Sequence, residues 1–240
     1  MIEAALAKIR LRDDLSAEEE TAILGAIGEV VSLPARHTFV HRGVRLNYST
    51  VLIDGMLARY KDMADGQRQI THVHVSGDFP DLHSFTLKYL DHSLMTLTPS
   101  RIAKVPHARL EEITKKMPRL TRILWFATNL DASIHREWEI SLGRRTAIQR
   151  AAHLLCELQA RLQVVGQADA SGFALPITQA EFSECLGLTP VHVNRVLRDL
   201  REAGLCEFRG GRVSIGDLAG LRATAEFDPA YLYLGRRDEA

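Results

Sequence analysis

One stretch, from Thr178 to Gly211, constrains the fold more than any other part of this chain. Its first residue is followed three positions later by Glu181, which is the pattern of a capping box at the start of a helix. Gly187 suits a tight turn, because glycine adopts a left-handed backbone at little cost. Thr189 and the proline after it begin a second helix, which Gly204 ends. The order of these signals predicts two short helices joined by one turn.

The second of these helices has two contrasting faces. Four apolar residues recur at the spacing of a buried stripe, namely Val193, Val196, Leu197 and Leu200. Another face carries no acid and ends in guanidinium groups. On that face, Arg195 can pair with a guanine edge through two hydrogen bonds, and Asn194 with an adenine or a phosphate. The pattern favours a recognition helix that enters the major groove of DNA.

A hairpin follows the second helix, with Gly210 and Gly211 at its turn and an arginine on either side. A helix-turn-helix followed by such a hairpin is a winged helix. The candidate DNA-binding residues are Thr178, Thr189, Val191, His192, Asn194, Arg195, Arg198, Arg201, Arg209 and Arg212. The alternative interpretation is a pair of amphipathic surface helices with a charged turn, because helix pairs are common in proteins generally.

Composition limits the class of protein without identifying a partner. The 240 residues suffice for two compact domains, and the apolar content of 46% and charged content of 25% are typical of soluble globular proteins. The formal net charge is zero, whereas nucleic-acid-binding proteins are often basic. Residues 186–212 contain five arginines and three acids. The DNA-binding interpretation therefore rests on pattern and not on bulk charge.

Location and redox state can also be predicted. No apolar run is long enough to span a membrane, and the N-terminal residues lack the basic and apolar segments of a secretory signal. A cytoplasmic protein without a membrane partner is therefore expected. The three cysteines, Cys156, Cys185 and Cys206, are far apart, and their odd number favours reduced thiols over a disulfide framework. Their core-like positions favour buried structural thiols over redox sensors.

The N-terminal half changes from helical to strand-like character. Residues 2–30 are predicted to be helical, with Ser16 and Glu19 as a capping box. Beyond them, short β-branched or alternating segments are separated by turn residues, which is typical of strands. The Asp54–Gly55 and Asp65–Gly66 pairs are predicted to be hairpin turns. Many short strands at regular spacing favour a sandwich, a jelly roll or a barrel.

Helical character returns after residue 108 and dominates from Pro118. Five apolar residues follow the spacing of a coiled-coil seam and are predicted to form a dimer interface: Leu120, Ile123, Ala127, Leu130 and Ile134. Because the pattern lasts for only about three heptads, a helix packed on its own domain is the alternative. Leu124, Trp125 and Trp138 lie off the seam and are predicted to pack against the strands. A hinge is predicted at residues 143–145.

The order of helix, β-roll, long helix and winged helix resembles the Crp/Fnr superfamily of bacterial transcription regulators, over nearly the whole chain. The resemblance is carried by the segments Asp65–Gly66, Gly77–Phe79, Arg150–Leu158 and, most specifically, Leu175–Leu188 running into Val193–Leu197. It implies an α+β fold with a jelly-roll domain like that of cyclic-nucleotide-binding proteins. The predicted parts are N-terminal helices and β-roll (1–117), a dimerisation helix (118–143), a winged helix-turn-helix domain (144–222) and a C-terminal tail (223–240).

The resemblance implies a homodimer with each winged helix on one half of a palindromic operator in double-stranded DNA. RNA polymerase is a further expected partner, and a regulator without catalytic residues is expected, so the protein is not predicted to be an enzyme. Arg195 matches the base-contacting arginine of the family. Val191 stands where many members carry a glutamate that contacts a cytosine, so the operator need not be the family's usual one. A valine can instead touch a thymine methyl group.

A cyclic nucleotide such as cyclic AMP is not the expected effector. Members that bind one place a Gly-Glu pair and then an arginine in one cassette, where the arginine neutralises the phosphate. The matching residues 77–97 contain no arginine, Asp78 replaces the glutamate, and Lys88 is the one permanent cation. Arg59 and Arg68 lie on other strands and are not expected to point inward. An iron–sulfur sensor would need about four suitably placed cysteines, which the N-terminal half lacks. The effector stays unidentified, and no cofactor is expected.

Two histidines keep a second class of function open. His72 and His74 point to the same face of a predicted strand, with Gly66 before them and Asp78 after them. This spacing is similar to the first metal motif of cupins, and two imidazoles with a carboxylate can hold Fe(II). The protein would then be a metal-dependent enzyme, or a metal or haem sensor. Against this, cupins use glutamate at the last position, and the second half of their signature is missing.

Overall fold

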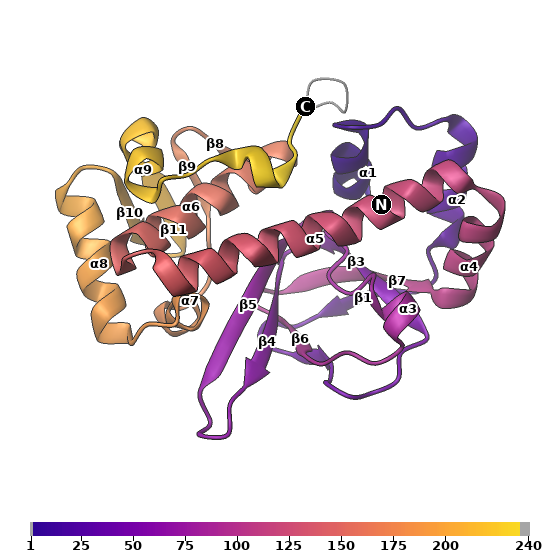
Figure 1. Cartoon of the computed structure of the whole chain (residues 1–240), viewed down its shortest axis with the longest axis horizontal. Coiled ribbons are helices and arrows are strands. Elements are labelled where there is room, and N and C mark those ends of the chain that lie inside the picture. The colour runs from indigo at the N-terminus through magenta and orange to yellow at the C-terminus, as the bar shows by residue number, and fades with distance from the viewer. Residues whose placement is uncertain (1, 236–240) are drawn as a thin grey trace. The chain divides into compact units, whose positions relative to one another are not determined.

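The computed structural model describes residues 2–235, which form two compact units. The β-roll unit takes in the described parts of residues 1–60, 73–133 and 233–240. The helix-turn-helix unit consists of residues 61–72 and 134–232. Figure 1 shows the course of the chain from the indigo N-terminal helices to the yellow C-terminal segment. Both helices and strands contribute throughout, which confirms the predicted α+β class.

Two sheets make up the roll. One has strand order β1-β7-β3, and the other has strand order β2-β6-β4-β5. The strands of the first sheet are β1 (Val30–Leu33), β3 (Tyr48–Asp54) and β7 (Ser100–Pro106). Those of the second are β2 (Thr38–Val40), β4 (Met56–Asp62), β5 (Arg68–Val75) and β6 (Ser93–Thr96). The short alternating segments of the sequence thus form the predicted roll.

The two predicted hairpin turns have different outcomes. Asp65–Gly66 lies between β4 and β5, which are neighbours in one sheet, so that prediction is confirmed. Asp54–Gly55 lies between β3 and β4, which belong to different sheets, so the prediction of a hairpin is wrong there. Gly55 has a φ of +98°, and a Cβ at this position would lie 2.8 Å from the carbonyl oxygen of Pro99. Glycine therefore lets the chain turn sharply from one sheet into the other.

Helices flank the strands of the β-roll unit. They are α1 (Glu3–Arg10), α2 (Ala17–Ala26), α3 (Ser84–Leu87) and α4 (His107–Lys116). The helical prediction for residues 2–30 is confirmed for α1 and α2. The residues between these two helices are not helical, and Val30 already belongs to β1. The predicted capping box is present, since the Glu19 N–H donates to Ser16 Oγ at 3.1 Å and the Ser16 N–H to the Glu19 carboxylate at 2.9 Å.

The longest helix, α5 (Pro118–Arg144), confirms the predicted long helix and ends at the predicted hinge. Its predicted dimer seam needs revision. Leu120 and Ile123 are 0% and 7% exposed and belong to the core of the β-roll unit, together with Leu110. A second chain cannot reach these two side chains, so the seam prediction is wrong for them. Ile134 is also buried, at 4% exposure, while Ala127 and Leu130 are half-buried.

The aromatic residues of α5 lie in different surroundings. Trp125 is 66% exposed, so the prediction that it packs against the strands is wrong. Leu124 does pack against the core of the β-roll unit. Trp138 is buried, but within the helix-turn-helix unit, where its indole N–H donates to the Glu157 carboxylate at 3.1 Å. Among the described residues no helix, α5 included, is both long and apolar enough to cross a membrane.

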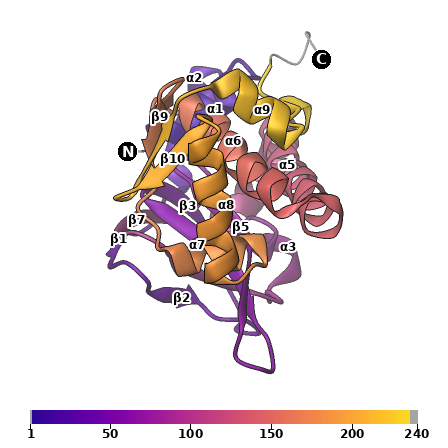
Figure 2. The same cartoon turned by 90° about the vertical axis from the view of Figure 1, so that its left-hand side faces the viewer.

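The helix-turn-helix unit combines helices with a small sheet of strand order β10-β11-β9-β8. Its helices are α6 (Ala147–Val164), α7 (Gln179–Leu186), α8 (Pro190–Glu202), α9 (Leu218–Ala225) and the 3-10 turn η1 (Pro229–Leu232). Its strands are β8 (Ala168–Asp169), β9 (Gly172–Ala174), β10 (Cys206–Arg209) and β11 (Arg212–Ile215). Figure 2 shows α7 and α8 next to each other and facing the viewer.

The C-terminal segment has a structural role that its sequence did not suggest. Helix α9 extends to Ala225, so the predicted boundary after residue 222 falls inside a helix. The Tyr231 hydroxyl donates to the Glu157 carboxylate at 2.9 Å. The Phe227 ring meets the His153 ring edge-on, with 5.2 Å between centroids. These residues belong to the helix-turn-helix unit and not to a separate tail.

Candidate DNA-binding site

The first helix of the pair, α7, begins and ends as its sequence predicts. Thr178 Oγ1 accepts a hydrogen bond from the Glu181 N–H at 3.1 Å, and the Glu181 carboxylate accepts one from the Thr178 N–H at 2.6 Å. Gly187 follows the helix with a φ of +60°, and its N–H donates to the Ser183 carbonyl. Phe182 is completely buried and anchors the helix. The predicted turn is therefore confirmed at its start and at its end.

The second helix, α8, buries the predicted stripe. Thr189 Oγ1 accepts a hydrogen bond from the His192 N–H at 3.3 Å, and Pro190 occupies the first helical position. The stripe residues are all buried: Val193, Val196, Leu197 and Leu200. Because this stripe faces the core, the rotation of α8 about its axis is fixed and the opposite face points to solvent.

The predicted DNA-binding residues are all exposed. They are Thr178, Thr189, Val191, His192, Asn194, Arg195, Arg198, Arg201, Arg209 and Arg212. Val191, in the first turn of α8, is 74% exposed. The outward face therefore offers guanidinium, amide, imidazole and methyl groups together. Such groups contact phosphates and base edges in DNA complexes.

The charge of this face is less uniform than the sequence spacing indicated. Arg198 Nε lies 3.9 Å from a carboxylate oxygen of Asp199 and 3.9 Å from one of Glu202. The prediction of an acid-free face is therefore wrong around Arg198. Exposed ion pairs at this distance contribute little free energy, so a phosphate can replace the carboxylates at small cost.

The β10–β11 hairpin forms the predicted wing. Gly210 and Gly211 have φ angles of +59° and +73°, and two successive left-handed residues are the requirement of a type I′ turn. Arg209 and Arg212 are paired across the hairpin, one on each side of the turn. The turn thus places two cations at the tip of the wing, where a phosphate would relieve their mutual repulsion.

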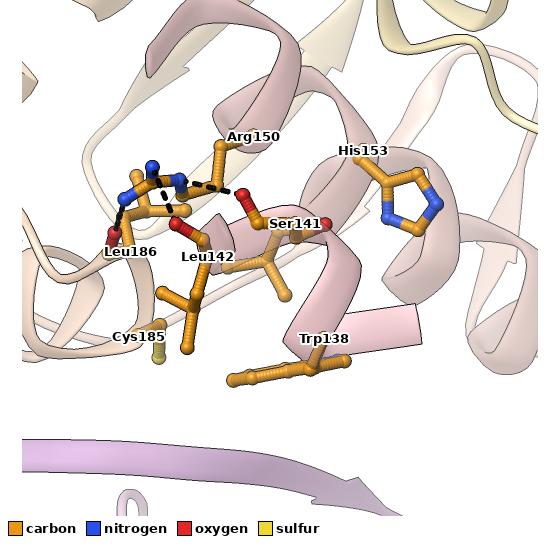
Figure 3. A pocket seen from close by; sticks show the side chains of 8 residues that line it. Trp138, Ser141, Leu142, Arg150, His153, Cys185 and Leu186 are labelled. Atoms are coloured by element: carbon orange, nitrogen blue, oxygen red, sulfur yellow. Dashed lines mark hydrogen bonds between the residues drawn. The ribbon is translucent and has the colours of Figure 1, made fainter. Parts of the chain in front are cut away.

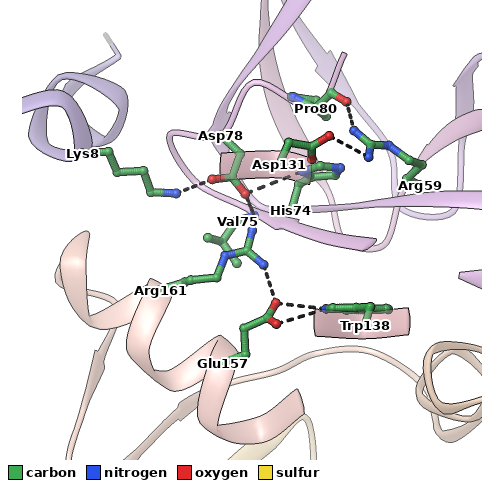
Figure 4. A network of polar contacts seen from close by, with 10 residues as sticks. All are labelled: Lys8, Arg59, His74, Val75, Asp78, Pro80, Asp131, Trp138, Glu157 and Arg161. Atoms are coloured by element: carbon green, nitrogen blue, oxygen red, sulfur yellow. Dashed lines mark hydrogen bonds and ion pairs between the residues drawn. The ribbon is translucent and has the colours of Figure 1, made fainter. Parts of the chain in front are cut away.

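The roll contains an arginine that the sequence interpretation had placed outside. Arg59, on β4, is 3% exposed, so the expectation that it does not point inward is wrong. Its Nη1 lies 2.9 Å from Asp131 Oδ2 on α5, and its Nη2 donates to the Pro80 carbonyl (Figure 4). Arg68 does lie apart, with its Nε 2.8 Å from Asp62 Oδ1. The inward arginine is therefore already paired with a carboxylate of its own chain.

The Gly77–Asp78 turn also makes contacts within the chain, because the Asp78 carboxylate accepts hydrogen bonds from Lys8 and Val75. Lys8 Nζ, on α1, lies 2.5 Å from Asp78 Oδ1, and the Val75 N–H donates to Asp78 Oδ2 at 2.9 Å (Figure 4). Gly77 has a φ of +88°, and a Cβ there would lie 2.6 Å from the carbonyl oxygen of Ala4. Helix α1 therefore packs directly on this turn, where a side chain on Gly77 would not fit.

Comparisons with known proteins match both units. A sequence model of the Crp-like helix-turn-helix domain matches residues 149–224, and one of the cyclic nucleotide-binding domain matches residues 30–117. A probable transcriptional activator of Rhizobium leguminosarum bv. viciae is 30% identical over 176 residues, which cover 72% of this chain and 71% of that protein. The chain belongs to the Crp/Fnr family of transcription regulators.

Two further similarities extend this assignment. The transcriptional activator protein FnrL of Cereibacter sphaeroides is 27% identical over 88% of this chain and 86% of its own length. The structure of FixK2 from Bradyrhizobium japonicum has a TM-score of 0.75 and 24% identity, and the match covers 82% of this chain and 96% of that chain. At this level of identity the structural likeness shows the fold alone. This Crp/Fnr protein is thus a DNA-binding transcription regulator, as predicted.

A small pocket of the helix-turn-helix unit shows a residue that was not predicted as functional. Arg150, on α6, donates to the carbonyls of Leu186 at 2.5 Å, Ser141 at 3.1 Å and Leu142 at 3.2 Å (Figure 3). These carbonyls lie at the ends of α7 and α5, where helical carbonyls lack partners within the helix. One guanidinium thus joins the end of the long helix to the turn of the Crp/Fnr helix-turn-helix. Contacts with backbone atoms of distant segments leave no spacing signal in the sequence.

The three thiols are free and buried, as predicted. Burial raises the pKa of Cys156 to about 12 and that of Cys206 to about 11. Burial also raises the pKa of Cys185 well above its usual value. A thiol that keeps its proton is a poor nucleophile and metal ligand, so these cysteines act as packing residues.

The metal-site alternative is not supported at His74, whereas a ring nitrogen of His72 and one of His135 lie within 4.8 Å of each other, as two ligands of one ion could. His74 Nδ1 lies 3.7 Å from Asp78 Oδ2, and burial, reinforced by the nearby Arg59 cation, lowers the pKa of His74 to about 4. The Asp78 carboxylate acts in the opposite direction and raises this pKa, but burial has the larger effect. His72, the second proposed ligand, lies with its ring edge-on to His135, at 5.4 Å between centroids. The surroundings of His74 therefore favour a structural role.

Proposed function

We propose that the protein is a homodimeric, sequence-specific regulator that binds a palindromic operator through α8 and the wing of each protomer. The observation that carries this proposal is the outward face of α8, where Arg195 and Asn194 are exposed opposite a fully buried stripe. An arginine at such a place discriminates guanine from a wrong base by about 1–3 kcal/mol. Val191 offers a methyl contact to thymine, so a half-site with guanine and thymine close together is expected.

For the dimer, we propose a stripe of α5 that differs from the one favoured by sequence spacing. Trp125, Asn129, Ala132 and Arg136 are exposed and follow one another at helical spacing. Trp125, at 66% exposure, is large enough to anchor a helix pair across a two-fold axis. Half-sites whose centres lie about one helical turn apart, roughly 34 Å, are expected for such a dimer.

We further propose that operator binding requires no cyclic nucleotide. The cassette of residues 77–97 contains no arginine, the inward Arg59 pairs with Asp131, and Asp78, which replaces the glutamate of the cassette, pairs with Lys8. The relatives described as transcriptional activators support activation with RNA polymerase as the partner. We also propose that the protein is located in the cytoplasm and has no catalytic activity.

Selection of binding sites from random DNA duplexes tests the proposal. The wild-type protein should enrich a palindrome. Arg195→Ala should lose the preference at one position of each half-site, at a cost of about 1–3 kcal/mol. Arg201→Ala, the matched control on the same helix, should weaken binding to all sequences alike and lower the salt dependence by about one ion. Failure of the wild-type protein to enrich any sequence, or an unchanged preference of Arg195→Ala, contradicts the proposal.

Sedimentation and nucleotide titration test the remaining parts. Trp125→Ala should sediment as a monomer at micromolar concentration, whereas Leu87→Ala, which truncates another exposed apolar side chain, should remain a dimer. Millimolar cyclic AMP should leave operator affinity unchanged. A dimeric Trp125→Ala variant rejects the proposed stripe, and a tenfold gain in affinity with cyclic AMP rejects nucleotide independence.

A further inference from the structure

The ion pair between Arg59 and Asp131 joins the inside of the roll to α5 (Figure 4). The side chains are 4% and 17% exposed, and both residues belong to the β-roll unit. Strand β4 supplies the cation, and the middle of α5 supplies the anion. A guanidinium taken out of water is costly unless an anion pairs with it, so the carboxylate is needed where it lies.

Three titratable groups near Arg59 provide little or no negative charge at neutral pH. Burial lowers the pKa of His74 and of His92 to about 4, so both imidazoles are neutral at pH 7. Burial raises the pKa of Asp81 to about 7, so this carboxyl is partly protonated at neutral pH. The Asp131 carboxylate, at hydrogen-bond distance from Nη1, is therefore a direct counter-charge of Arg59.

We propose that Asp131 is an internal ligand, whose carboxylate fills an anion-binding position at Arg59 inside the roll. Without that side chain, the position becomes a binding site for a small carboxylate such as acetate. Because Asp131 is part of α5, the filled position also fastens this helix to the strands of the β-roll unit. The anion site is independent of the proposed DNA binding, and only its effect on operator affinity rests on that function.

The geometry suits a free carboxylate. The 2.9 Å contact between Nη1 and Oδ2 is a charge-assisted hydrogen bond, which is stronger than a neutral one. Truncation of Asp131 to alanine removes a carboxyl group close to acetate in size. The partial exposure of this side chain gives a small anion a route from solvent. The Pro80 carbonyl, which accepts from Nη2, remains to orient the guanidinium.

Thermal unfolding of the full-length Asp131→Ala variant, with and without sodium acetate, tests the proposal. Without acetate, the midpoint should fall by roughly 5–10 °C, because the buried Arg59 cation loses the carboxylate that lies at hydrogen-bond distance from its Nη1. Acetate should restore at least half of this loss with a saturable dependence on concentration, and sodium chloride at equal ionic strength should not. An unchanged midpoint, or equal responses to the two salts, overturns the proposal.

Three further variants separate the anion site from a general effect of salt. Glu29→Ala removes an exposed carboxylate that pairs with Lys104 and should show no acetate response. The double variant Arg59→Gln with Asp131→Ala lacks the cation and should also show none. Asp131→Asn fills the space without charge, so it should lose stability and gain nothing from acetate. If Asp131→Ala does not fold, a higher refolding yield in acetate than in chloride supports the site, and equal yields reject it.

Operator binding is measured separately, on the sequence that the wild-type protein selects. Asp131→Ala should bind it at least about fivefold more weakly, and acetate should restore the affinity. If acetate restores the stability of the variant but not its DNA affinity, the result supports the anion site at Arg59. It also shows that this site is not coupled to DNA binding. A wild-type protein that selects no operator would reject the proposed function and leave the stability experiment as the test of the anion site.

Discussion

Each unit encloses a charged pair, and the two pairs join residues at very different separations along the chain. In the β-roll unit, Arg59 meets Asp131, which comes 72 residues later on another element. In the helix-turn-helix unit, Glu157 meets Arg161 one turn later on α6, at 2.9 Å. The second pair can form as soon as its helix forms, whereas the first requires the complete unit. A buried charge can thus be supported locally or by the overall fold, and the two arrangements should fail differently.

The largest expected effect is at Arg161. Arg161→Ala leaves the Glu157 carboxylate, which is 0% exposed, without a cation and should destabilise the protein by about 3–5 kcal/mol. Arg59→Met should cost less, about 1–3 kcal/mol, because the Asp131 carboxylate is 17% exposed and reaches water. Urea unfolding measures both, with Arg161→Lys as the charge-retaining control. Equal losses for Arg161→Ala and Arg59→Met would remove the distinction between the two pairs.

Acid should open the β-roll unit before the helix-turn-helix unit. Burial lowers the pKa of His74, His92 and His107 to about 4 in the first unit, and of His153 to about 3 in the second. A histidine with a lowered pKa stabilises the fold above its unfolded pKa of about 6.5, and this contribution is lost as the pH falls toward the folded value. Asp81, whose pKa is raised to about 7, has the opposite sign and offsets one of the three.

The second unit has a similar offset, since burial raises the pKa of Glu157 and works against His153. The β-roll unit therefore loses more stability between pH 6.5 and 4. Hydrogen exchange followed by mass spectrometry, at a series of pH values corrected for intrinsic rates, should show earlier loss of protection in peptides of β3, β6 and β7 than in those of α6. Simultaneous loss, or the reverse order, contradicts the prediction.

A smaller effect is expected at the C-terminal segment. Tyr231→Phe removes one of the donors to Glu157 and leaves the Arg161 contact in place. The expected loss is about 1–2 kcal/mol, the usual cost of one unsatisfied hydrogen bond at a buried group. Tyr89→Phe, at a side chain that is 51% exposed, is the matched control and should have no effect on urea unfolding. The same result for both variants would mean that the segment contributes nothing to the support of this charge.

The smallest effect is expected at an exposed pair. Lys104 Nζ lies 2.8 Å from Glu29 Oε2, but the glutamate side chain is 65% exposed. Glu29→Gln should leave the thermal midpoint unchanged within error, because water and salt screen such pairs. A measurable loss would indicate that an ion pair contributes to stability whether or not it is buried. Burial would then not explain the expected difference between the Arg161 and Arg59 variants.

Local signals explain why the DNA-binding helices could be predicted from the sequence. The Thr178 capping box, Gly187 and the proline after Thr189 act within a few residues of themselves, so the same bonds appear in the structure. The seam of α5 was a different problem. Leu120 and Ile123 show a periodicity that suits a dimer and a core equally well, and the structure places them in the core.

Contacts between distant segments explain the other errors. Nothing next to Arg59 in the sequence indicates Asp131, and strand alternation alone does not fix which face of β4 is inside. The turn at Gly55 would be a hairpin if β3 and β4 paired with each other, but the two strands belong to different sheets. The local sequence does not indicate which sheet β4 joins. Arg150 bonds to backbone carbonyls, which every residue possesses, so no side-chain pattern could reveal its partners.

The hydrogen bond from Tyr231 to Glu157 limits how far the chain can be shortened. The family match of the helix-turn-helix domain ends at residue 224, one residue before the end of α9. A fragment cut there would include every proposed DNA-binding residue, yet it would uncover the His153 ring and leave the buried carboxylate with one donor fewer. The smallest fragment of this protein that keeps its helix-turn-helix unit intact therefore extends to Leu232, eight residues beyond the match to the domain model.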